Sequence, residues 1–191
     1  MRYLKLGLVV ATAALAAFGG VSTASATTLT GSSGKFLPAG TEIHAVLDSG
    51  QVSTLTTVYK NIVCEESTIQ GKTANESGAV VSVSVEALTF GKCNCEVKVI
   101  SGGTISISLG GVVASNGTEV TTSCITVFGS VHCIYKTSAT TLGTLTGGTT
   151  ATMDIEGANI PRLATDVLCA EKANWDTKYL VTSPDTLKID P

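Results

Sequence analysis

The sequence is poor in the residues on which most enzymes and nucleic-acid-binding proteins depend. Of its 191 residues only 14% are charged and 5% are aromatic, and two are histidines. The formal net charge is −3 and no cluster of lysine or arginine occurs, so the positive surface needed to bind nucleic acid is missing. No cysteines show the C-x2-C spacing of zinc sites, and no serine stands in a G-x-S-x-G motif. We therefore expect no enzymatic activity, no metal and no cofactor.

Long apolar runs are also missing, with one exception at the N-terminus. Arg2 and Lys5 precede an apolar run over residues 6–18, and Ala24-Ser25-Ala26 supplies small residues of the kind that signal peptidases accept. This run is too short to cross a bilayer, which takes about 20 residues. The pattern predicts a bacterial signal peptide over 1–26, cleavage before Thr27, and a secreted mature chain without a membrane span.

Cysteines are the one reactive residue type present in number. Six of them follow the predicted cleavage site, at Cys64, Cys93, Cys95, Cys124, Cys133 and Cys169. An even number of cysteines in an exported chain predicts disulfide bonds. Cys93 and Cys95 cannot easily close on each other, so each is expected to reach a different partner, with Cys64 and Cys169 left to receive them.

The remaining two cysteines have a local argument for pairing. Residues 124–133 read as two short strands around Gly129-Ser130, and such a hairpin would bring the two sulfur atoms together. We therefore expect Cys124–Cys133 as the best-supported bridge. A metal site is the alternative use of these thiols, but no histidine partner is suitably placed.

The composition of the mature part favours strands. Threonine, serine, glycine and valine dominate, as in short strands joined by glycine-rich turns. Residues 81–87 alternate strictly between apolar and polar side chains, which predicts a half-buried strand. Asn116-Gly117 predicts a type I′ hairpin turn, because both central positions of that turn need positive φ.

Turn signals recur between strand-like segments along the rest of the chain, and this recurrence predicts the fold class. We expect an all-β domain over 41–191, a single disulfide-stabilised antiparallel sandwich of Ig-like or jelly-roll-like type. A loose polar lead-in is expected over 27–40. Residues 164–175 are the most helix-like part of the mature chain and could hold one short turn. Trp175 and Tyr179, the largest side chains near the end of the sequence, are expected to fill one end of the core.

The C-terminal segment carries a resemblance to known proteins. Cys169, Trp175 and Tyr179, followed by Thr182-Ser183-Pro184, resemble the ending of many small uncharacterised secreted proteins of high-GC Gram-positive bacteria. Weaker similarities over 37–41, 64–71 and 88–93 resemble exported bacterial proteins described as activators of alkane oxidation. This resemblance implies an apolar ligand but assigns no functional residue.

Few side chains are candidates for acid–base or metal chemistry. His44 and His132 are the only groups that titrate near neutral pH, and His44 has Asp48 nearby in sequence. Asp154 and Glu156 share one face of a predicted strand and could hold Ca²⁺, although a solvated outer face explains both carboxylates more simply.

These observations leave three classes of function. The first is a non-enzymatic extracellular or cell-envelope protein that acts by binding or assembly, through self-association or contact with envelope or matrix components. Long uncharged strands over 80–85 and 104–113 would favour such strand-to-strand association. The second is a secreted binding module for an apolar ligand or a glycan, which a cavity lined by aromatic residues would favour. The third is a secreted hydrolase, which a histidine converging with a carboxylate in a cleft would favour.

Overall fold

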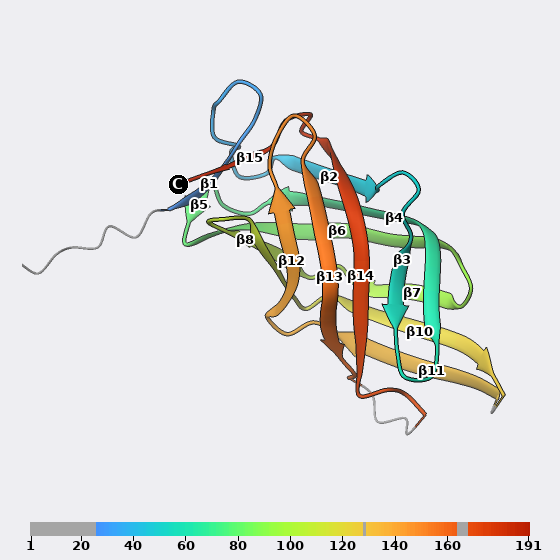
Figure 1. The fold of residues 1–191 in the computed structure, drawn as a ribbon. Helices are drawn as coiled ribbons and strands as arrows, with labels where there is room; N and C mark the ends of the chain where they lie inside the picture. Colours follow the sequence, from blue (N-terminus) through green and yellow to red (C-terminus); the bar gives the residue numbers. More distant parts are fainter. Residues whose placement is uncertain (1–25, 128, 164–167) are drawn as a thin grey trace, which may run out of the picture.

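The structure is a computed structural model that describes residues 26–127, 129–163 and 168–191. Every regular element within these residues is a β-strand (Figure 1). The strand pairings within these residues are antiparallel, and three disulfide bonds connect them. The predicted all-β, antiparallel and disulfide-bonded fold is therefore confirmed. The predicted signal peptide lies outside the described residues except for Ala26. In the described part of the chain, no helix has the length and apolarity of a membrane span.

The largest sheet closes on itself, which corrects the predicted simple sandwich. Around the ring its strands are β13 (Thr152–Pro161), β12 (Thr140–Thr146), β9 (Val112–Asn116), β8 (Thr104–Ser108), β6 (Val80–Cys93), β4 (Asn61–Thr73), β2 (Glu42–Leu47) and β14 (Lys172–Ser183). β13 and β14 pair with each other, and this pairing closes a barrel-like sheet. β3 (Ser53–Thr56) continues the position of β2 between β4 and β14. Alternating strands bury one face in a sandwich and in a barrel alike, so the sequence pattern could not separate the two.

Two smaller sheets flank the ring. The first has the order β11 (Gly129–Lys136), β10 (Glu119–Thr126), β7 (Glu96–Ser101), and the second has the order β15 (Lys188–Asp190), β1 (Thr27–Thr30), β5 (Ser77–Gly78). A single bridge between Tyr135 and Arg162 joins β11 to the end of β13. The β10–β11 hairpin projects past one end of the ring (Figure 1, lower right). Val131, Cys133 and Tyr135 of β11 belong to the same apolar core as the ring.

The strands expected to promote assembly have no free edge. Residues 80–85 belong to β6, which pairs with β4 on one side and β8 on the other. Residues 104–108 form β8, which pairs with β6 and β9. Because their backbone groups are already hydrogen-bonded, these strands offer no template for another chain.

The expected Asn116-Gly117 hairpin is wrong, and so is its type I′ turn. Gly117 has a φ of 79°, as the sequence predicts, but Asn116 does not have the positive φ that this turn type also needs. In addition, β9 before the turn pairs with β8 and β12, whereas β10 after it pairs with β7 and β11. The turn therefore passes the chain from the ring to a second sheet.

Part of the expected loose lead-in over 27–40 is a buried strand. β1 lies between β15 and β5, and its four residues are all buried. The hydroxyl of Thr27 donates to Ala79 O at 3.3 Å and that of Thr30 donates to Asp190 Oδ2 at 2.6 Å. A polar segment can be buried when its polar atoms find partners in this way. The helical turn considered for 164–175 is absent from the described residues 168–175, and β14 begins within them at Lys172.

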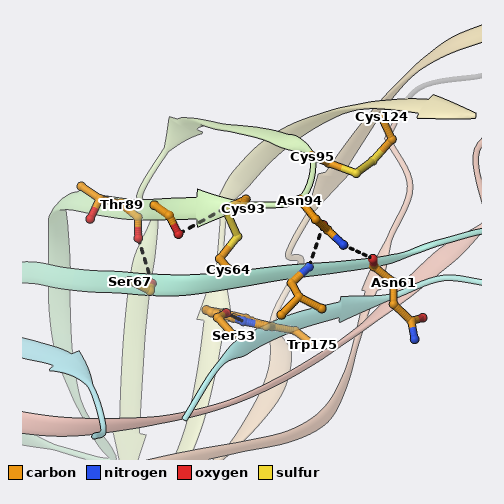
Figure 2. Close-up of a disulfide and its surroundings, with 12 residues drawn as sticks. Ser53, Asn61, Cys64, Ser67, Thr89, Cys93, Asn94, Cys95, Cys124 and Trp175 are labelled. Atoms are coloured by element: carbon orange, nitrogen blue, oxygen red, sulfur yellow. Dashed lines mark hydrogen bonds between the residues drawn. A yellow bond between two sulfur atoms is a disulfide. The ribbon is translucent and has the colours of Figure 1, made fainter. Parts of the chain in front are cut away.

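Trp175 and Tyr179 lie in the core, as expected. The Trp175 ring packs edge-on against Phe90, at 6.1 Å between ring centroids, and against Tyr179, at 6.4 Å. Its Nε1 donates to Ser53 Oγ at 2.9 Å, and both residues are labelled in Figure 2. Tyr179 is fully buried, and its hydroxyl lies 2.6 Å from Ser67 Oγ. Both large aromatic side chains therefore satisfy their polar atoms inside the core.

The ionisation of Tyr179 should make the free energy of unfolding fall with rising pH in the alkaline range. Burial raises the pKa of its hydroxyl far above 10.0, whereas an unfolded tyrosine ionises at about pH 10. Above that pH the unfolded chain loses a proton that the folded chain keeps, so stability present below pH ~10 is lost as pH rises, by up to about 1.4 kcal/mol per pH unit. Tyr179→Phe should be less stable than the parent by about 1 kcal/mol at pH 7, because one hydrogen bond is lost.

The difference in stability between the parent and Tyr179→Phe should shrink as the pH is raised to 11. Urea unfolding of both proteins at pH 7 and pH 11 measures it. The comparison controls for all other titrating groups, because the parent and the variant share them. A difference that stays constant with pH would show that Tyr179 is not held neutral by folding.

Candidate functional site

All six cysteines are paired, but the expected Cys124–Cys133 bridge is wrong. The bridges are Cys64–Cys93, Cys95–Cys124 and Cys133–Cys169. The separate partners expected for Cys93 and Cys95 are confirmed, and Cys64 is one of them. Cys169 instead forms a disulfide with Cys133, which lies in β11.

The register of the strands explains the error. The β10–β11 hairpin is present, but Cys124 lies opposite Val131 and Cys133 lies opposite Thr122, so the two cysteines are staggered. Cys64 and Cys93 lie directly opposite each other in β4 and β6, with 4.0 Å between their Cα atoms. A direct cross-strand neighbour is closer than a staggered one, so Cys64 and Cys93 can meet whereas Cys124 and Cys133 do not.

Asn94 fixes the connection between the ring and the β7–β10–β11 sheet (Figure 2). Its side-chain oxygen accepts from Val63 N and its amide nitrogen donates to Asn61 O, both at 3.0 Å. Bridges on either side tie this segment to β4 through Cys93 and to β10 through Cys95. The position of β10 relative to β4 is thereby held by covalent bonds and hydrogen bonds together.

A groove of about 510 Å³ lies at the end where the β10–β11 hairpin projects. The turn between β3 and β4, the hairpin and the segment 168–170 form its walls. Its apolar lining includes Ile62, Ile125, Val127, Val131, Tyr135 and Leu168. Ile125 and Val127 are 87% and 94% exposed, and exposed apolar side chains gathered at one place mark a binding surface. We call this feature the hairpin groove.

The floor of the hairpin groove adjoins the core. Ile62 and Tyr135 line both the groove and an inner cavity of about 40 Å³, whose other walls include Phe90 and Trp175. Tyr135 is only 1% exposed, and we find no hydrogen bond to its hydroxyl within the described ranges. Burial raises the pKa of this hydroxyl, and nearby Arg162 opposes that change. The floor of the groove is thus mostly apolar, with the protonated hydroxyl of Tyr135 and the hydroxyl of the buried Thr122.

Charge is nearly absent from the hairpin groove. Among its described lining residues, Lys60 alone carries a charge. Five lysines elsewhere form ion pairs with carboxylates, namely Lys72, Lys92, Lys98, Lys136 and Lys178. Lys60 has no such partner in the part of the chain that the structure describes. The mouth of the groove therefore carries an uncompensated positive charge.

No family model, curated protein or solved structure matches the chain. The resemblance to secreted proteins of high-GC Gram-positive bacteria stays a prediction. The hairpin groove, in contrast, is a feature of the structure, with a volume of about 510 Å³ and a mostly apolar lining.

The candidate acid–base residues lie apart from each other and outside the groove lining. His44 Nδ1 on β2 lies 2.7 Å from Thr182 Oγ1, and His132 Nε2 on β11 lies 3.3 Å from Ser130 Oγ. Asp48 accepts from the backbone of Ser49 instead of pairing with His44. The structure does not bring either histidine into hydrogen-bond contact with a carboxylate within the described residues.

Asp154 and Glu156, the two carboxylates considered for Ca²⁺, have different surroundings on β13. Asp154 forms an ion pair of 3.0 Å with Lys178, while Glu156 is exposed. The described residues contain no group of three or more side chains able to hold a metal ion. Asp154 therefore acts in cross-strand pairing between β13 and β14.

Sequence reasoning missed the hairpin groove because its walls come from segments far apart in the chain. One local signal was available. Ile125 and Val127 stand next to a hairpin turn, and Val58-Tyr59 stand in the turn between β3 and β4. Turns are normally polar, so apolar residues at two turns indicate a surface kept apolar for another reason.

Proposed function

We propose that this protein is an exported, non-enzymatic binding protein whose hairpin groove takes up the hydrocarbon chain of an apolar ligand. The observation that carries the proposal is the groove itself, which is concave, apolar and continuous with the core. Its volume falls in the range of about 300–1,000 Å³ typical of small-molecule sites. Two disulfides hold its walls, Cys95–Cys124 and Cys133–Cys169, so little order has to be created on binding.

Export is the part of this proposal that the sequence supports most. The predicted signal peptide over 1–26 and the three disulfides agree, because disulfides persist in oxidising compartments outside the cytoplasm. The resemblance to secreted proteins of Gram-positive bacteria points the same way. We infer that the mature chain acts outside the cytoplasm or at the cell envelope.

The lining favours a hydrocarbon chain over a glycan. Apart from Tyr59 and Tyr135, its larger apolar members are aliphatic. A glycan would lose water from many hydroxyl groups, and the aliphatic walls return few hydrogen bonds to replace it. A hydrocarbon chain gains from the same walls, by about 0.8 kcal/mol for each buried methylene group.

Straight-chain alcohols should bind with an affinity that rises with chain length. Each added methylene that enters the groove should lower Kd by about fourfold. Displacement of the uncharged dye Nile red by 1-hexanol, 1-octanol and 1-decanol measures this series. Ile125→Asp should weaken 1-decanol binding at least tenfold, because it places a charge on the apolar wall.

Leu109→Asp is the matched control for this substitution. Leu109 is an exposed apolar residue in the turn between β8 and β9, outside the groove lining. Both substitutions are at exposed positions, so neither should change stability by more than about 0.5 kcal/mol. Equal alcohol binding by all three proteins would contradict the proposal. A parent dimer that Ile125→Asp converts to a monomer would show instead that the groove is an assembly surface.

A further inference from the structure

We infer that the ligand of the hairpin groove is a long-chain carboxylate, with its charged head at Lys60 and its chain along the apolar walls. This inference rests on the proposed function and goes beyond it, because an apolar groove by itself does not distinguish a charged amphiphile from a neutral one. The distinguishing feature is the arrangement of charge around the mouth of the groove.

The turn that carries Lys60 is fixed from within. The Thr57 hydroxyl donates to Lys60 O at 2.8 Å, and it accepts from Lys60 N at 3.0 Å. Thr57 N also donates to Lys60 O at 3.0 Å. The backbone of Lys60 is thus held at the mouth, while its exposed side chain keeps the freedom to reach an anion.

No carboxylate competes for this ammonium group at the groove. The described lining contains neither aspartate nor glutamate, and Lys60 forms no ion pair with any described residue. Five of the nine described lysines pair with a carboxylate, as Lys72 does with Glu86 at 3.0 Å, and Lys60 is one of the four that do not. A lysine left unpaired beside an apolar groove complements an anionic head next to a hydrocarbon chain.

The depth of the groove orients the ligand. Its floor is made by Ile62 and Tyr135, next to the apolar inner cavity. A carboxylate placed there would lose its water and meet only the hydroxyls of Tyr135 and Thr122, while the nearby Arg162 guanidinium already donates to Cys169 O, so this placement is unfavourable. A carboxylate at the mouth keeps part of its hydration and faces Lys60. The chain end therefore lies at the floor and the head lies at the mouth.

The experiment compares decanoate with 1-decanol by displacement of Nile red at pH 8, below the concentration at which either aggregates. The measured quantity is the ratio of the two affinities in the parent and in Lys60→Gln. Lys60→Gln should lower the relative affinity for decanoate by about two- to tenfold and leave that for 1-decanol unchanged. Raising NaCl from 0.02 to 0.5 M should lower the ratio in the parent and much less in Lys60→Gln.

Two further variants separate the possible outcomes. Lys35→Gln removes the same charge from an exposed lysine outside the groove lining, so it should behave as the parent. Tyr135→Phe should also keep the ratio, because the chain end lies at the floor. If Tyr135→Phe lowers the ratio and Lys60→Gln does not, the head lies at the floor and the inference is overturned. If 1-decanol binds but Lys60→Gln changes nothing, the carboxylate inference fails while the groove function stands. If neither ligand binds the parent, the groove function itself fails.

Discussion

Trp175→Ala should lower the free energy of unfolding by about 3–5 kcal/mol, the usual loss when a large aromatic side chain is removed from a core. Trp175 is only 7% exposed, packs edge-on against Phe90 and Tyr179, and bonds Ser53 through its indole nitrogen. Its removal would enlarge the inner cavity that it lines. It would also leave the Ser53 hydroxyl without this donor. Thermal melting and urea unfolding of the purified variant measure the loss.

Tyr59→Ala is the control for the loss of an aromatic ring as such. Tyr59 is an exposed aromatic residue at the rim of the hairpin groove, so its removal should cost less than about 0.5 kcal/mol. Trp175→Phe should fall between the two, because it keeps a ring in the core but loses the hydrogen bond to Ser53. A Trp175→Ala protein that melts within a degree or two of the parent would show that Trp175 does not hold the core together.

Removing the Cys95–Cys124 bridge by a double substitution to serine should cost about 2–4 kcal/mol of stability and also weaken alcohol binding. Both effects have a structural cause. The bridge closes a sequence separation of 29 residues, and Cys124 lies in the wall of the hairpin groove. Without it, strand pairing alone holds β10 to β7. Urea unfolding without reductant gives the first effect, and Nile red displacement by 1-decanol at low urea gives the second.

The Cys64–Cys93 bridge provides a closely matched control. It closes the same separation of 29 residues, so its removal should cost a similar amount of stability. Its cysteines do not line the groove, so 1-decanol binding should change much less. Equal losses of binding in the two double variants would mean that binding follows overall stability and not the wall of the groove.

Much of the fold could be predicted from local pattern because strands and core residues leave local signals. The alternation over 81–87 marks a real strand, and Trp175 with Tyr179 fills the core as expected. Closure of the sheet left no such signal, because it depends on the pairing of β13 with β14. The burial of Thr27–Thr30 was equally hidden, since those threonines look like a polar leader until their hydroxyl partners are known.

The disulfide pairing and the groove show the same limit in different ways. For Cys124 and Cys133 the hairpin was predicted but its register was not, and the stagger between them decides which sulfur atoms meet. For the groove, Lys60, Ile125 and Leu168 come from three separate segments. Each lacks any local feature that would associate it with the other two, so only the three-dimensional arrangement reveals the site.

The small sheet that holds β1 has a consequence for the order in which the chain folds. Thr28 pairs with Asp190, 162 residues further along, while β5 lies much nearer in sequence. During synthesis β1 therefore cannot pair with β15 until the C-terminal end of the chain has been made. Contacts between residues so far apart in sequence slow folding, because a long loop must close before they form. If the chain is exported as we propose, this delay keeps it from completing its native structure early, and slow folding would help it cross a membrane unfolded.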